Sequence, residues 1–166
     1  AYAKANPGKL SYGSAGVGTV NHLTGELFKS LTGANDILHV PYKGAGPAVT
    51  DLISAQIPMA VANITGQIIG LHQAGKLRIL AVTSPKRLAA APDIPTAVEA
   101  GVPGMVSQNF IGLFAPAHTP KPIVEQIARA TQVAMADQDY QRMLLASGFE
   151  AEIDSNPDSA RRFLMD

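Results

Sequence analysis

The chain has 166 residues, a length that fits one domain or one domain plus part of another, and 46% hydrophobic with 16% charged residues is typical of a packed globular protein. Lysine plus arginine equals aspartate plus glutamate at 13 each, so no net charge draws the chain to nucleic acid or to anionic lipid. The chain contains no cysteine, which excludes disulfides, thiolate metal ligands and cysteine nucleophiles.

The first half of the chain alternates short apolar segments with segments of helical periodicity. The apolar segments are predicted to be strands, at 10–13, 37–42, 57–63 and 77–83. The periodic segments are predicted to be helices, at 20–31, 47–55 and 64–74. Because apolar strands alternate with helices, the pattern favours an α/β fold with a mostly parallel sheet flanked by helices on both faces.

The second half of the chain is rich in proline and alanine and then becomes helical. A short helix is predicted after Pro95, and residues 106–114 are predicted to be extended. Thr119 is predicted to cap a helix that has Pro120 in its first turn. The remaining predicted elements are a helix at 139–147, a strand at 150–153 and a helix opened by Ser155, Asn156 and Pro157.

The ends of the chain indicate a piece of a longer protein. No apolar run approaches the roughly 20 residues that a membrane-spanning helix needs, and no signal peptide is present. Residues 1–4 are typical of the end of a helix rather than the start of a protein. We therefore expect a fragment.

Charge is distributed unevenly along the chain. Residues 1–92 carry eight basic and three acidic side chains, whereas residues 93–166 carry five basic and ten acidic ones. A segment poor in carboxylates suits an anionic ligand, and chance surface charge explains the same distribution. Both interpretations stay open.

A glycine-rich turn joins the first predicted strand to the first predicted helix. Such a junction presents unpaired backbone N–H groups and the positive end of the helix dipole, which together favour an anion. Glycine lets a ligand approach the backbone, and hydroxyls add donors. The candidate ligand-binding residues here are Ser14, Ala15, Gly16, Gly18 and Thr19. A tight turn with Thr19 as helix cap explains the same residues, so the two interpretations stand side by side.

Other motifs that bind phosphate or perform catalysis do not fit. A dinucleotide fingerprint would need a third glycine where Asn21 stands, and no Gly-Lys-Ser/Thr follows for a P-loop. The four histidines have no ligand spacing, so no metal site is predicted. No nucleophile elbow of the Gly-x-Ser-x-Gly type is present, and no catalytic residue is predicted.

A second turn of the same design follows the second predicted strand. Its candidate ligand-binding residues are Tyr42, Lys43 and Gly44. Because ligands of open α/β sheets bind beyond the carboxyl ends of the strands, the two turns are expected to lie together. Lys43 could pair with a carboxylate or be a solvated turn residue. Asn63 could bind a ligand or cap the next helix, and Phe110 could line a cleft or pack in the core.

Six segments in order along the chain carry a family pattern. They are Tyr2–Leu10, Tyr12–Gly16, His39–Gly44, Ala74–Thr83, Pro92–Thr96 and Gly112–Pro116. Together they resemble the solute receptors of tripartite tricarboxylate transporters, often called the Bug family. The resemblance covers essentially the whole chain.

The resemblance implies a periplasmic, two-lobed binding protein of the type II periplasmic-binding-protein class that closes on a small carboxylate. Residues 1–108 would form the second, ligand-gripping lobe, and residues 109–166 would cross over and return in part to the first lobe. The family chain is longer and begins with that first lobe. Its expected partners are the membrane subunits of the transporter, and no cofactor, enzymatic activity or nucleic acid is implied.

Two departures from the family pattern bear on the ligand. The family commonly has acids in the strand at 57–63 and often has tryptophan where Phe110 stands. Without those acids an amino-acid ligand would lose a partner for its ammonium group, which favours a simple mono- or dicarboxylate.

Two alternative functions and one assembly remain to be weighed. A small α/β enzyme acting on a carboxylated or phosphorylated metabolite would use the same turn, and a ligand-sensing domain of a regulator would share the fold. A lobe without its partner strands exposes sheet edges and an apolar face, so we also expect the chain to form a homodimer.

Overall fold

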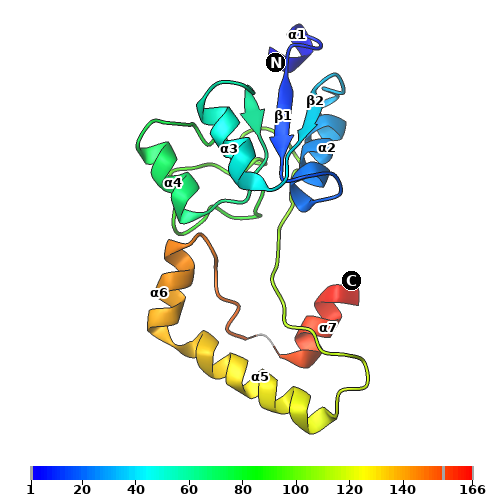
Figure 1. Ribbon diagram of the computed structural model, residues 1–166, viewed down its shortest axis with the longest axis vertical. Coiled ribbons are helices and arrows are strands. Elements are labelled where there is room, and N and C mark those ends of the chain that lie inside the picture. The colour runs from blue at the N-terminus through cyan, green and yellow to red at the C-terminus, as the bar shows by residue number, and fades with distance from the viewer. Residues whose placement is uncertain (1, 155, 166) are drawn as a thin grey trace. The chain divides into compact units, whose positions relative to one another are not determined.

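The computed structural model of the protein describes residues 2–154 and 156–165 (Figure 1). The chain divides into two compact units, Ala1–Asn109 and Phe110–Asp166. That the second unit belongs to the first lobe of a two-lobed protein stays a prediction.

The first unit is built on a parallel sheet of strand order β2-β1-β3. The strands are β1 (Ser11–Ser14), β2 (Leu38–Pro41) and β3 (Met59–Ala60). Both neighbours of β1 run parallel to it, and Gly13 is in register with Val40 on one side and Ala60 on the other. The predicted parallel α/β architecture is therefore confirmed, and all three strands end at the same edge of the sheet.

Capping residues determine where the helices of this unit begin and end. Its helices are α1 (Tyr2–Ala5), α2 (Val20–Thr32), α3 (Ala45–Ile53) and α4 (Gly66–Gln73). Thr19 and Thr65 cap α2 and α4 with their hydroxyls, which accept from the third helical N–H. Gly33 ends α2 in the left-handed conformation, at φ 66°. Helix α3 begins at Ala45, two residues before the predicted start at Pro47.

Helix α2 packs closely on β1 through a tyrosine and a glycine. Tyr12 is 2% exposed and lies in a cluster with Ala34 and Ile37, against which Phe28 packs. A Cβ on Gly25 would collide with the Tyr12 ring, so only glycine allows this approach. The contact fixes the amino-terminal end of α2 beside the carboxyl end of β1.

The segment at 77–83 does not form the predicted strand. Within the described chain, its only sheet-like pairing is an isolated bridge between Val82 and Thr96. The Val82 N–H donates to the Pro95 carbonyl at 2.9 Å, and its own carbonyl accepts from the Ala97 N–H at 2.7 Å. The apolar side chains that suggested a strand are used in packing instead, because Val82 joins Ile69 and Ile94 in a second core cluster.

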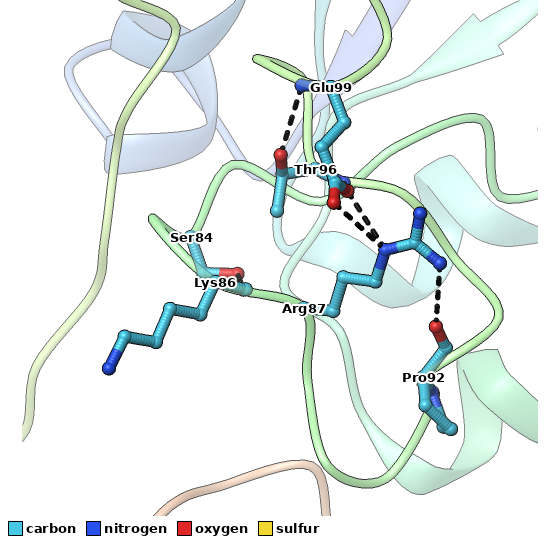
Figure 2. A network of polar contacts seen from close by, with 6 residues as sticks. All are labelled: Ser84, Lys86, Arg87, Pro92, Thr96 and Glu99. Carbon is cyan, nitrogen blue, oxygen red and sulfur yellow. Dashed lines mark hydrogen bonds and ion pairs between the residues drawn. The ribbon is translucent and has the colours of Figure 1, made fainter.

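A network of polar contacts holds the loop that follows (Figure 2). Thr96 and Glu99 exchange two hydrogen bonds, one from each backbone N–H to the other side chain, as in a capping box. Arg87 donates to the Glu99 carboxylate at 2.9 Å and to the Pro92 carbonyl at 3.0 Å. These contacts keep the pKa of Glu99 below its usual value. The helix predicted after Pro95 is only a turn stabilised by this network.

The second unit is helical. Its helices are α5 (Lys121–Ala136), α6 (Gln138–Ala146) and α7 (Pro157–Met165). Pro120, not Thr119, is the residue before α5, and the Asp137 side chain caps α6. The predicted strand at 150–153 is absent, since this segment has no neighbouring strand to pair with in the described part of the unit. Ser155, expected to open α7, lies outside the described residues.

The helices of the second unit keep their apolar faces exposed. None of the described residues of α5, α6 or α7 is buried, and Ile123 and Ile127 on one face of α5 are each more than 40% exposed. Among the helices that the structure describes, none combines the length and apolar character needed to cross a membrane.

Candidate carboxylate-binding site

The two glycine-rich turns predicted as candidate sites lie side by side at the carboxyl end of the sheet. The Tyr42 N–H donates to the Ser14 carbonyl at 3.0 Å, and the Gly44 N–H donates to the Ala15 carbonyl at 3.1 Å. Helices α2 and α3 begin directly after the two turns. The structure therefore brings the amino-terminal ends of two helices to one edge, where their dipoles favour an anion.

The first turn, residues 14–19, is held by its own side chains. The Gly16 carbonyl accepts from the Thr19 hydroxyl at 2.7 Å, and the Gly16 N–H donates to Ser14 Oγ at 3.2 Å. Gly18 has φ 79°, a conformation that favours glycine. A Cβ on Gly16 would lie 3.3 Å from the Tyr42 carbonyl of the second turn. Glycine at position 16 therefore lets the two turns approach each other closely.

The open donors of this turn are not those of its glycines. Among the residues that the structure describes, the N–H groups of Ala15 and Val17 donate no hydrogen bond, whereas Gly16 and Gly18 donate to side chains of the protein. Ser14 is 0% exposed, so its hydroxyl shapes the turn from inside. A carboxylate beside the turn would thus meet the N–H groups of Ala15 and Val17 first.

The second turn, residues 42–46, has fewer side-chain contacts. Tyr42 donates its hydroxyl proton to Asp51 Oδ2 at 2.7 Å, and this hydrogen bond raises the pKa of Tyr42. Gly44 caps α3 at φ 106° without a side-chain bond, because it has no side chain to give one. Lys43 is exposed and forms no ion pair with any residue in the described ranges. Its charge is free to meet a ligand.

Asn63 adds a third strand end to the same edge of the sheet. It follows β3 and is exposed, and its Oδ1 accepts from Asn21 Nδ2 at 3.0 Å. Asn21 is the second residue of α2 and is buried. The amide N–H₂ of Asn63 is thereby oriented by a residue of the first turn's helix and has no protein acceptor in the described chain.

Phe110 belongs to the second unit. Its ring stands edge-on to Phe163 with the ring centroids 5.1 Å apart. Its role as a wall of the cleft stays a prediction.

Two histidines, which the sequence pattern did not single out, support the first turn. His39 Nε2 lies 2.7 Å from Ser14 Oγ, and His22 Nδ1 accepts from the Gly18 N–H at 3.2 Å. The two rings stack with centroids 4.2 Å apart. Burial lowers the pKa of His39, which favours the neutral form of its ring. The spacing of four residues between Gly18 and His22 in the sequence could have indicated their contact, because His22 lies in the first turn of α2.

Neither metal binding nor nucleophilic catalysis is supported by this arrangement. Across residues 2–154 and 156–165, no three histidine or acidic side chains gather as a metal site would require. Ser14 and His39 are placed like a nucleophile and its base, but the buried Ser14 cannot reach a substrate.

Comparisons with known proteins identify the family and the fold of the chain. Residues 1–166, the whole chain, match the family described as "Tripartite tricarboxylate transporter family receptor". The chain belongs to this family. BugT of Bordetella pertussis is 32% identical over 166 residues, which are all of this chain and 50% of BugT. As a receptor family member, the chain shares its fold with solved periplasmic proteins.

Two of these structures are particularly similar. A periplasmic transporter structure is 40% identical, with a TM-score of 0.86 over 99% of this chain and 54% of the other. Rpa4515 of R. palustris, solved with adipate, is 32% identical, with a TM-score of 0.86 and the same coverage. The type II periplasmic-binding-protein-like fold is thereby confirmed. The chain spans about half the length of the curated relatives it matches.

Proposed function

We propose that the chain is the ligand-gripping part of an extracytoplasmic solute receptor that binds a small carboxylate and delivers it to a tripartite tricarboxylate-type transporter. The observation that carries the proposal is the pairing of the two turns, by which Gly44 donates to Ala15 and two helix starts meet at one edge. Membership in a receptor family and the adipate bound to Rpa4515 support it. On this proposal the receptor acts in the periplasm and has no enzymatic activity.

The turns suit a carboxylate by the kind of donor that they offer. One carboxylate oxygen would accept from the N–H groups of Ala15 and Val17, and the other from the first turn of α3 beside Gly44. Hydrogen bonds to a charged acceptor are shorter and stronger than those between neutral groups. Lys43 would add a positive charge from the exposed rim of the second turn.

The ligand class follows from what the site lacks. The segment at 57–63 contains no acid, so nothing in it would pair with the ammonium group of an amino acid. A dicarboxylate fits best, with its second carboxylate beyond the two turns, where a second lobe would close over it and expel water. Closure of that kind would be the signal read by the membrane subunits.

An NMR titration of the chain with adipate tests the proposal even if binding is weak. Adipate should shift the amide signals of residues 15–20 and 43–46 and leave those of α4 unchanged. Adipamide, which has the same length and no charge, is the matched control and should shift neither set. Shifts confined to other residues, or equal shifts with adipamide, would remove the carboxylate from these turns.

A further inference from the structure

His22 and His39 form a layer behind the first turn. They come from α2 and β2, and their stacked rings each reach a different residue of the turn, His39 at Ser14 and His22 at Gly18. His39 also stacks on Tyr12 of β1, at 4.9 Å between centroids. The turn is thus contacted near both of its ends by imidazole nitrogens.

The hydrogen bond of Gly18 determines the protonation state of His22. A backbone N–H is always a donor, so His22 Nδ1 must carry a free lone pair to accept from it at 3.2 Å. His22 is therefore neutral in this arrangement and carries its proton on Nε2. A protonated ring would present two N–H groups facing each other, and Gly18 would lose its acceptor.

We propose that His22 and His39 are positioning residues for the carboxylate-binding turn, and that the turn keeps its binding geometry only while His22 Nδ1 accepts from the Gly18 N–H. The proposal deepens the proposed function and rests on it for its link to affinity. Gly18 lies between Val17, whose N–H is open, and Thr19, whose hydroxyl holds the Gly16 carbonyl. Release of Gly18 would therefore move the donors that meet the ligand.

The other titratable groups near the pair have partners of their own. Glu26 is ion-paired with Lys29 at 2.9 Å, and that contact lowers the pKa of the carboxyl group. Tyr12 donates to Glu26 and stays protonated. Burial lowers the pKa of His39, which favours the neutral ring in contact with Ser14.

The loss of the Gly18 hydrogen bond would change the shape of the turn directly, because Gly18 stands next to the open N–H of Val17. Removal of the acceptor at position 22 should therefore lower the affinity for adipate about fivefold.

NMR of the ¹⁵N-labelled chain without ligand tests the positioning role. The His22 ring should be in its Nε2–H form, with Nδ1 accepting from the Gly18 N–H. In His22→Asn, whose carbonyl oxygen replaces Nδ1 as acceptor, the Gly18 amide signal should stay in place, whereas in His22→Ala it should move. His72 is the matched control, because its Nδ1 accepts from the Ile79 N–H in the same way away from the site. His72→Ala should leave the Gly18 signal unchanged.

Affinity measurements on the same variants complete the test. His22→Asn should bind adipate as well as the unchanged chain does, whereas His22→Ala should bind about fivefold more weakly. A Gly18 signal that stays in place in His22→Ala, or a His22 ring in its Nδ1–H form, would overturn the proposal whatever the ligand. A Gly18 signal that moves in His22→Ala, in a chain that does not bind adipate, would instead refute adipate as the ligand and retain the positioning role.

Discussion

The two turns of the candidate site have the same sequence design but are stabilised differently. The first turn is held by three side-chain contacts, from Ser14, Thr19 and His22, before any ligand arrives. The second has a glycine cap without a side chain and an exposed Lys43, and backbone bonds attach it to the first. A preformed turn spends little free energy on ordering when a ligand binds, whereas an adaptable one can adjust to the ligand. We infer that the first turn determines affinity and the second adjusts it.

The largest effect should come from replacing Gly18 with valine. Gly18 has φ 79°, and a β-branched side chain there would both strain the backbone and cover the adjacent open N–H of Val17. Adipate affinity should fall by about 100-fold or more, which corresponds to about 2.7 kcal/mol. Calorimetry or NMR titration measures it.

Gly75→Val is the matched control for Gly18→Val. Gly75 has φ 67° and, like Gly18, no atom within 4 Å of the position that a Cβ would take, but it follows α4 away from the turns. Both variants should lose similar stability to chemical denaturation, and only Gly18→Val should lose binding. Equal affinities in the two variants would exclude the first turn from the site.

The next effect concerns the hydroxyl of Thr19. Thr19→Val keeps the shape of the side chain and removes both the helix cap and the bond to the Gly16 carbonyl. Stability should fall by about 1 kcal/mol, as for other lost caps, and affinity by about tenfold. Thr65 caps α4 in the same way, so Thr65→Val should cost the same stability and leave adipate binding unchanged. If both variants lose affinity alike, the effect of Thr19 is general destabilisation.

How far the sequence predicted this site depends on the range of the contacts. Thr19, Gly33 and Thr65 act within one helical turn, so the helix boundaries came out within two residues. The parallel direction of the strands followed from the alternating pattern, whereas the strand order β2-β1-β3 was not predicted. The strand predicted at 77–83 was wrong because the pairing partner of this segment, Thr96, depends on a loop closed by Arg87 and Glu99.

The histidine pair was missed for the same reason. His22 and His39 lie 17 positions apart, and Ser14 and His39 lie 25 apart. The register of β1 with β2 brings His39 to Ser14, and the packing of α2 on β1 brings His22 to His39. A pattern read along one helix or one strand cannot reveal a contact made between two. The site residues themselves remain predictions until a ligand is observed on them.

The stability of the first turn should also depend on pH. His39 has a folded pKa below its usual value because it is buried, so the unfolded chain binds a proton more readily. Stability is therefore full above the unfolded pKa of histidine, about 6.5, and is lost as the pH falls below it. His39→Gln, which keeps a side-chain donor for Ser14, should flatten this decline in urea unfolding between pH 8 and pH 5. A decline of equal slope in both proteins would assign it to other groups.

The smallest effect should come from Lys43 in the second turn. Its ammonium group is exposed and forms no ion pair with the residues that the structure describes, so an interaction with a bound carboxylate would be screened by water and salt. Lys43→Gln should lower adipate affinity about two- to fivefold at low salt and less at high salt, in keeping with an exposed pair worth up to ~1 kcal/mol. Lys76→Gln, another exposed lysine of the same unit, is the matched control and should change nothing. The affinity loss in Lys43→Gln could instead be as large as that in Gly18→Val and independent of salt. The second turn would then hold the carboxylate in a site shielded from solvent, and the roles assigned to the two turns would be reversed.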